Sequence, residues 1–143
     1  MKVSELWQYL GSVFENPNDL KGYNYNKHED ETTEFTLLEK GTYIIVNKDS
    51  HGYQLYDIDK GKNVFFEAGW IEDEVPEPEF KIIHIPATEA LELLIESLTK
   101  TIITLTAEGW SENPDNKYFD LTPEVTRLKT IQDILNSLKN EEN

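Results

Sequence analysis

The sequence contains no cysteine, which excludes disulfide bonds, thiolate nucleophiles and cysteine–zinc sites. It also lacks the G-x-S-x-G, G-x-G-x-x-G and phosphate-loop motifs of common hydrolases and nucleotide-binding folds. The longest apolar stretch, near residues 91–105, is interrupted by Glu92, Glu96 and Lys100 and is too polar to span a bilayer. The N-terminus shows no apolar signal-peptide segment, so we expect a cytoplasmic protein that binds no membrane.

Basic residues are scarce. Thirteen Lys and Arg face 28 Asp and Glu, and the formal net charge is −15. Arg127 is the sole arginine, a bias that suits an AT-rich genome such as that of a low-GC bacterium or its phage. Because this charge repels phosphate backbones, we expect no direct binding of nucleic acid. The charge steers basic partners toward the protein, although a role in solubility alone explains the same composition.

Length and composition favour a single folded domain over residues 1–143. Hydrophobic residues make up 38% of the chain and aromatic residues 11%, which is typical of a folded core. A chain of this size buries roughly two-thirds of its unfolded surface, so it needs no metal or disulfide for stability. Only residues 140–143 are expected to be a frayed tail.

Apolar residues recur at helical spacing in three segments, which predicts helices over residues 3–15, 88–107 and 122–139. Thr88 and Thr122 are the expected N-caps of the second and third helices. The last helix is expected to bury one apolar stripe, formed by Val125, Leu128, Ile131, Ile134, Leu135 and Leu138.

Alternating or continuous apolar runs predict five short strands, at residues 35–39, 42–47, 53–58, 63–67 and 80–85. The last is expected to be buried on both faces, with His84 as a structural histidine. Residues 17–33 and 72–79 are polar and are predicted to be exposed loops. This order of elements predicts an α+β fold. In it, an antiparallel sheet of about five strands has the N-terminal helix and two C-terminal helices packed on one face.

Acidic side chains and a tryptophan cluster between residues 63 and 80, where no basic residue occurs. Aromatic residues supply buried contact area in interfaces, and carboxylates steer a basic partner toward them. The sequence therefore predicts a partner-binding surface formed by Glu67, Trp70, Glu72, Asp73, Glu74, Glu77 and Glu79. The alternative is a solvated loop that protects the edge of the sheet from aggregation.

Three histidines and one pair of aspartates are the remaining candidates for chemistry. His28 lies among acids in a polar segment, and His51 lies in a turn before Gly52. Asp57 and Asp59 resemble the start of a calcium loop, but the glutamate required eleven positions after Asp57 is absent. A hairpin turn explains the two aspartates equally well, so we expect neither a metal site nor a cofactor.

Aromatic side chains in two polar segments form a second candidate surface, consisting of Tyr23, Tyr25, Trp110, Tyr118 and Phe119. Tyrosine and tryptophan are enriched in interfaces, but they also serve as lids over small cores. We favour the lid for these five residues.

The leading hypothesis is a small, acidic, non-enzymatic protein that docks on a basic protein surface. In its sharpest form it is a phage or bacterial inhibitor that occupies the nucleic-acid site of a nuclease or another DNA- or RNA-binding protein. One alternative is a toxin-neutralising immunity protein, which would use the same acidic docking. Another is a small metal-dependent hydrolase that uses His28, Asp57 or Asp59.

Overall fold

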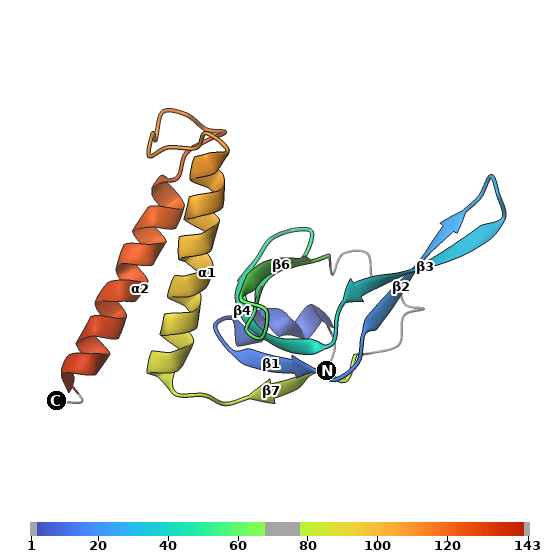
Figure 1. Cartoon of the computed structure of the whole chain (residues 1–143), viewed down its shortest axis with the longest axis horizontal. Helices are drawn as coiled ribbons and strands as arrows, with labels where there is room; N and C mark the ends of the chain where they lie inside the picture. Colours follow the sequence, from blue (N-terminus) through green and yellow to red (C-terminus); the bar gives the residue numbers. More distant parts are fainter. Residues whose placement is uncertain (1–2, 68–77, 142–143) are drawn as a thin grey trace. The chain divides into compact units, whose positions relative to one another are not determined.

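The computed structural model describes residues 3–67 and 78–141, and the chain divides into two compact units, Met1–His84 and Ile85–Asn143. The described strands belong to the first unit and two long helices to the second (Figure 1). The α+β class with a five-stranded antiparallel sheet is confirmed. The single domain, and the packing of the two C-terminal helices on the sheet, concern how the units combine and stay predictions.

The larger sheet has the strand order β6-β5-β4-β1-β7, and every neighbouring pair is antiparallel. Its strands are β1 (Val13–Asn16), β4 (Gly41–Lys48), β5 (Tyr53–Asp57), β6 (Lys62–Phe66) and β7 (Lys81–Ile83). Three consecutive strands, β4, β5 and β6, form the meander that the short connections predict. β1 lies between β4 and β7, so the strand nearest the N-terminus is in the interior of the sheet.

The first predicted helix is wrong over its second half. A 3-10 helix, η1, covers Val3–Tyr9, and the chain then turns and continues as β1. Gly11 has a φ of +83°, a conformation that ends a right-handed helix and that glycine adopts without strain. The amide of Gly11 donates to the carbonyl of Ile45 at 2.7 Å, and the amide of Ile45 donates to the carbonyl of Ser12 at 3.0 Å. Pairing with β4 therefore overrides the helical periodicity of the sequence.

The predicted loop over residues 17–33 is also wrong. β2 (Leu20–Asn26) pairs with β3 (Glu31–Leu38) in a separate two-stranded sheet, here called the ribbon, which extends beyond the larger sheet in Figure 1. Most of its residues are exposed, as expected of this segment. Strand formation was hidden because the alternating partners of its tyrosines are asparagine and glycine, which rarely mark a strand. Residues 72–77 of the other predicted loop lie outside the described residues, and of the remaining two Pro78 is buried, contrary to expectation, while Glu79 is exposed.

The core of the first unit is rich in aromatic rings. Phe14 lies at its centre, with ring centroids 5.7 Å from Tyr43 and 4.8 Å from Phe80. Leu6 of η1 and Ile45 of β4 are fully buried in the same cluster. β4 is buried on both faces from Tyr43 to Val46, which places this strand deepest in the unit.

β7 differs from its prediction. It is a three-residue edge strand whose side chains are exposed or half-buried, and His84 beyond it is exposed rather than structural. Only Phe80, directly before β7, is buried in the core. The apolar composition predicted burial on both faces, whereas β7 is an edge strand that pairs only with β1 and remains partly exposed to solvent.

The second unit is a pair of packed helices, α1 (Ala87–Ala107) and α2 (Thr122–Glu141), which bury Leu94, Leu98, Ile131 and Leu135. Lys139 forms an ion pair with Glu92 at 3.2 Å, so the end of α2 lies beside the start of α1. Ile134 is exposed, contrary to expectation, because it points away from this seam.

The helix ends also correct the prediction in part. α1 begins after Pro86 with no side-chain cap, so Thr88 lies inside the helix. Thr122 begins α2, but the capping group is Asp120, whose Oδ1 accepts the backbone amide and the hydroxyl of Thr122 at 2.9 and 2.6 Å. These hydrogen bonds lower the pKa of Asp120. α2 continues through Glu141, so residues 140 and 141 of the predicted frayed tail are helical, and residues 142 and 143 lie outside the described residues.

Candidate functional site

The predicted acidic surface is described only at its two ends. Glu67 follows β6 and Glu79 precedes the buried Phe80, and both carboxylates are exposed. The other members, Trp70, Glu72, Asp73, Glu74 and Glu77, lie outside the described residues. The partner-binding role of the whole surface therefore stays a prediction, and the described site begins from Glu79.

Glu79 lines an open cleft of about 300 Å³ at the base of the ribbon. The segment between β1 and β2 supplies Asp19 to the cleft, and β2 supplies Lys21 and Tyr23. Pro78 completes the wall next to Glu79. The fold thus brings an acid of the predicted surface together with a tyrosine that the sequence placed in a different candidate.

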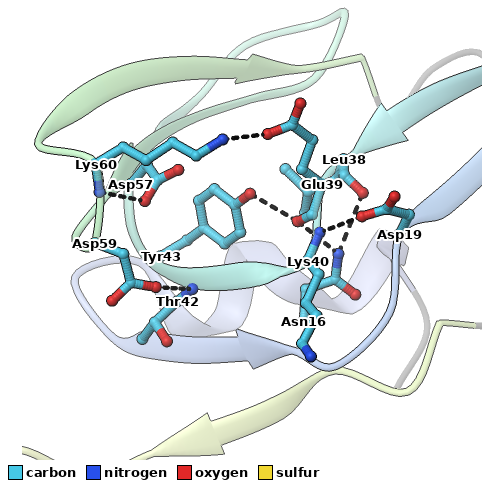
Figure 2. Close-up of polar contacts among 10 residues, drawn as sticks. All are labelled: Asn16, Asp19, Leu38, Glu39, Lys40, Thr42, Tyr43, Asp57, Asp59 and Lys60. Carbon is cyan, nitrogen blue, oxygen red and sulfur yellow. Dashed lines mark hydrogen bonds and ion pairs between the residues drawn. The ribbon is translucent and has the colours of Figure 1, made fainter.

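The acidic side of this cleft is held in place by the backbone, as Figure 2 shows. Oδ1 of Asp19 accepts a hydrogen bond from the amide of Lys40 at 2.7 Å. Nearby, Nδ2 of Asn16 donates to the carbonyls of Leu38 and Glu39 at 3.3 and 3.0 Å. These bonds join the end of β1 and the residue before β2 to the chain at the end of β3, and the Lys40 amide holds the Asp19 carboxylate directly.

A second polar cluster in Figure 2 surrounds the hydroxyl of Tyr43. This hydroxyl donates to the carbonyl of Glu39 at 2.7 Å, and the Glu39 carboxylate forms an ion pair with Nζ of Lys60 at 2.6 Å. Lys60 thereby lowers the pKa of Glu39, and Glu39 raises the pKa of Lys60. Burial, helped by the charges of Asp57 and Glu39, raises the pKa of Tyr43 to about 12. The cluster thus links β4 and the β5–β6 turn to the residue that follows β3.

The two aspartates of the hydrolase hypothesis bind backbone amides. Oδ1 of the buried Asp57 accepts from the amide of Lys60 at 3.0 Å, and Oδ2 of Asp59 accepts from the amide of Thr42 at 3.3 Å. They close the β5–β6 turn and fasten it to β4, as the hairpin interpretation implies. His28 is exposed in the turn of the ribbon. Within residues 3–67 and 78–141, no three His, Cys, Asp or Glu side chains gather as a metal site.

One face of the ribbon carries two exposed tyrosines. Tyr23 and Tyr25 are two residues apart on β2, so their side chains share a face, and each is 56% exposed. Glu34 lies opposite Tyr23 across the ribbon, and Thr32 lies opposite Tyr25. The hydroxyl of Tyr25 donates to Oδ1 of Asp30 at 2.6 Å, a bond that raises the pKa of Tyr25. The tyrosine face consists of these two rings and five side chains around them, namely Lys21, Asp30, Thr32, Glu34 and Thr36.

The five aromatic residues of the second predicted surface belong to different units. Tyr23 and Tyr25 lie on the ribbon, and their exposure shows that they are not lids over a core. In the second unit Trp110 meets Phe119 edge to face, with ring centroids 5.8 Å apart. Tyr118 beside them is 79% exposed. The signal that could have identified the ribbon is the period-two spacing of Tyr23 and Tyr25 opposite a threonine-rich segment.

The candidate site is thus the tyrosine face together with the acidic cleft at its base. Of the helices in the described part of the chain, none combines the length and apolarity that crossing a membrane requires. In comparisons with protein-family models, curated proteins and solved structures, the chain matches none.

Proposed function

We propose that this protein is a non-enzymatic binding protein that docks its acidic surface on a basic protein partner. The observation that carries the proposal is the cleft that Asp19 and Glu79 line together with the exposed ring of Tyr23, where their two carboxylates outnumber the single ammonium group of Lys21. Aromatic rings of this kind supply anchoring area in interfaces, and the surrounding carboxylates select a cationic partner. The formal net charge of −15 adds a long-range attraction between the whole protein and a basic partner.

In its sharpest form the partner is a nuclease or another DNA- or RNA-binding protein, and this chain is a phage or bacterial inhibitor of it. A surface that binds phosphate groups presents lysine and arginine, and the same cations attract carboxylates. Docking there would exclude nucleic acid by occupation of its site. A toxin-neutralising immunity protein would use identical chemistry and would differ only in the partner.

The test is capture of proteins from a lysate of the source organism on the immobilised chain, at about 50 mM and about 300 mM NaCl. We expect the retained proteins to be basic, to be released at the higher salt, and to be displaced by added duplex DNA. Each retained protein is then assayed for nucleic-acid binding with and without the soluble chain. Retention of acidic proteins, or retention that DNA and salt leave unchanged, would contradict the proposal.

Two double variants of equal net charge test whether binding depends on the cleft or only on the overall charge. Asp19→Asn with Glu79→Gln removes two charges from the cleft, and Glu108→Gln with Glu112→Gln removes two from exposed positions of the second unit. Both double variants have the same net charge. We expect the first to associate with a captured partner roughly fivefold more slowly and the second to associate almost as fast as the wild type. Equal rates for the two would show that only the overall charge matters.

A further inference from the structure

We infer that the tyrosine face and its cleft bind two arginine side chains from one extended segment of the partner. This inference rests on the proposed function and names the chemistry that the site recognises. Each tyrosine ring has a carboxylate beside it, and a guanidinium group can stack on the ring while it hydrogen-bonds to the carboxylate.

The first ring is Tyr23, at the base of the ribbon. It lines the cleft with Asp19 and Glu79, and it lies directly across the strand pair from Glu34. Two carboxylates thus line the same cleft as this half-exposed ring, and a third belongs to the residue opposite it on β3. Arginine fits this arrangement better than lysine, because its planar group stacks and donates several hydrogen bonds at once.

The second ring is Tyr25, closer to the turn. Its hydroxyl donates to one oxygen of Asp30 at 2.6 Å, which leaves the other oxygen of that carboxylate as an acceptor beside the ring. Asp30 itself has a φ of +49°, so the turn that presents its side chain has a defined backbone conformation. The second arginine would stack on Tyr25 and hydrogen-bond to Asp30.

The spacing of the rings sets the spacing of the cations. Residues two apart on a strand are separated by about 6.6 Å, and alternate side chains of an extended partner have the same spacing. The site therefore favours two arginines separated by one residue over two adjacent arginines, whose side chains point to opposite sides of an extended chain.

The site is also organised before binding. The Lys40 amide holds Asp19 at 2.7 Å, the register of β2 against β3 sets the positions of both tyrosines along the ribbon, and the hydrogen bond to Asp30 orients Tyr25. Groups that are already ordered lose less conformational entropy when a ligand binds, so a larger part of the contact energy appears as affinity.

One basic residue opposes the ligand. Nζ of Lys21 lies 2.9 Å from Oγ1 of Thr36 and 3.9 Å from Oε1 of Glu34, on the same face as the two rings. Four carboxylates at Asp19, Asp30, Glu34 and Glu79 exceed this one ammonium, so the site keeps a net negative charge. Lys21 nevertheless competes for Glu34, and we expect Lys21→Gln to strengthen binding about twofold.

The experiment is a nuclear magnetic resonance titration of the full ¹⁵N-labelled chain with short capped peptides of serine and glycine. One peptide carries Arg-Ser-Arg, a second carries two adjacent arginines, and a third carries Lys-Ser-Lys. We expect saturable shifts in the amides of Asp19, Tyr23, Tyr25 and Asp30. We also expect the Arg-Ser-Arg peptide to bind about threefold more tightly than either of the others. Equal affinities for the three peptides, or shifts spread over both units, would overturn the inference.

Variants separate ring stacking from simple attraction. Tyr23→Leu with Tyr25→Leu keeps apolar bulk but removes both π faces, and we expect it to weaken Arg-Ser-Arg binding about tenfold. Tyr118→Leu is the matched control, because Tyr118 is an even more exposed tyrosine in the second unit, and it should bind as the wild type does. If the Tyr23→Leu, Tyr25→Leu double variant (the ribbon variant) bound the Arg-Ser-Arg peptide as tightly as the wild type, the inference would be wrong.

The two proposals fail in distinguishable ways. If the wild-type chain captures basic proteins but the ribbon variant captures them equally, the arginine site is wrong and the proposed function stands. If the peptides bind at the ribbon but no basic protein is captured, the proposed function fails instead. A third outcome is that the amide resonances of the ribbon shift with protein concentration in the absence of any peptide. That result would identify a second copy of this chain as the occupant and would overturn the inference.

Discussion

The five-stranded sheet and the ribbon are both antiparallel and both rich in aromatic residues, yet they place these residues in opposite environments. In the sheet, Phe14 and Tyr43 are at most 1% exposed, whereas Tyr23 and Tyr25 on the ribbon are each 56% exposed. β3 contains both environments, since its first six residues are exposed and Leu38 at its end is buried. Aromatic residues on antiparallel strands thus form a core in the five-stranded sheet and an exposed surface on the ribbon.

This difference indicates what each region is for. Buried aromatic residues stabilise the fold through area removed from water and through ring contacts. Exposed ones give no such benefit, and under the proposed function those of the ribbon contact the partner. The ribbon is therefore the region where substitutions should change binding and leave stability almost unchanged, and the sheet should show the reverse.

The largest expected effect is on the sheet side. Phe14→Ala should destabilise the protein by about 3–5 kcal/mol, because it leaves a cavity between Tyr43 and Phe80. Urea unfolding followed by circular dichroism measures the change. A loss below about 1 kcal/mol would mean that the centre of the core lies elsewhere.

The stability of the fold at alkaline pH should depend on the ionisation of a buried tyrosine of the sheet. The pKa of Tyr43 is raised to about 12 in the folded protein, while a tyrosine of the unfolded chain ionises near pH 10. Its contribution to stability is therefore complete below about pH 10 and is lost as the pH rises toward 12, by about 2–3 kcal/mol in total. Tyr43→Phe should remove this component of the pH dependence. Equal slopes for the variant and the wild type between pH 10 and 12 would contradict the assignment.

A smaller effect is expected where the ribbon packs on itself. A Cβ atom added at Gly22 would lie 2.7 Å from Cζ of Phe35, whose ring covers this glycine from the opposite strand. Gly22→Ala should therefore push the ring aside and destabilise the ribbon by about 1 kcal/mol. Amide hydrogen exchange should become faster in β2 and β3 and remain unchanged in β4 and β5. Faster exchange throughout the first unit would show that the ribbon and the sheet unfold together.

The smallest expected change in stability is at the tyrosine face. Tyr23→Ala should alter the free energy of unfolding by no more than about 0.5 kcal/mol, because its ring is largely in water. The same variant should lose affinity for the Arg-Ser-Arg peptide. A destabilisation comparable to that of Phe14→Ala would erase the distinction between the two regions.

The parts of the fold that sequence predicts well are those made from neighbouring segments. The meander of β4, β5 and β6 follows from alternating apolar residues between short turns, and α1 and α2 follow from long apolar stripes. β1 was misassigned because Val13 and Phe14 continue a helical spacing. Their true partners in β4 and β7 lie about 30 and 70 residues away in the sequence, as the register of the sheet shows.

The site was predictable only in its ingredients. Glu79 belongs to the predicted acidic surface and Tyr23 to the predicted aromatic one, but their meeting in one cleft depends on tertiary structure. Asp19 was not predicted at all, because a lone aspartate between two strands carries no local signal. Its role becomes visible only through the Lys40 amide that holds it and the cleft that it lines.

β1 leaves the ribosome before the strands that flank it. β4 can pair with one edge of β1 once Lys48 has left the exit tunnel, but β7 reaches the other edge only after Ile83 has left it. Nascent chains of intermediate length therefore present an open strand edge next to Phe14, which still lacks its contact with Phe80. Such an edge is the kind of surface that aggregates or recruits chaperones during synthesis. The five-stranded sheet can therefore be completed only after β7 has emerged from the exit tunnel.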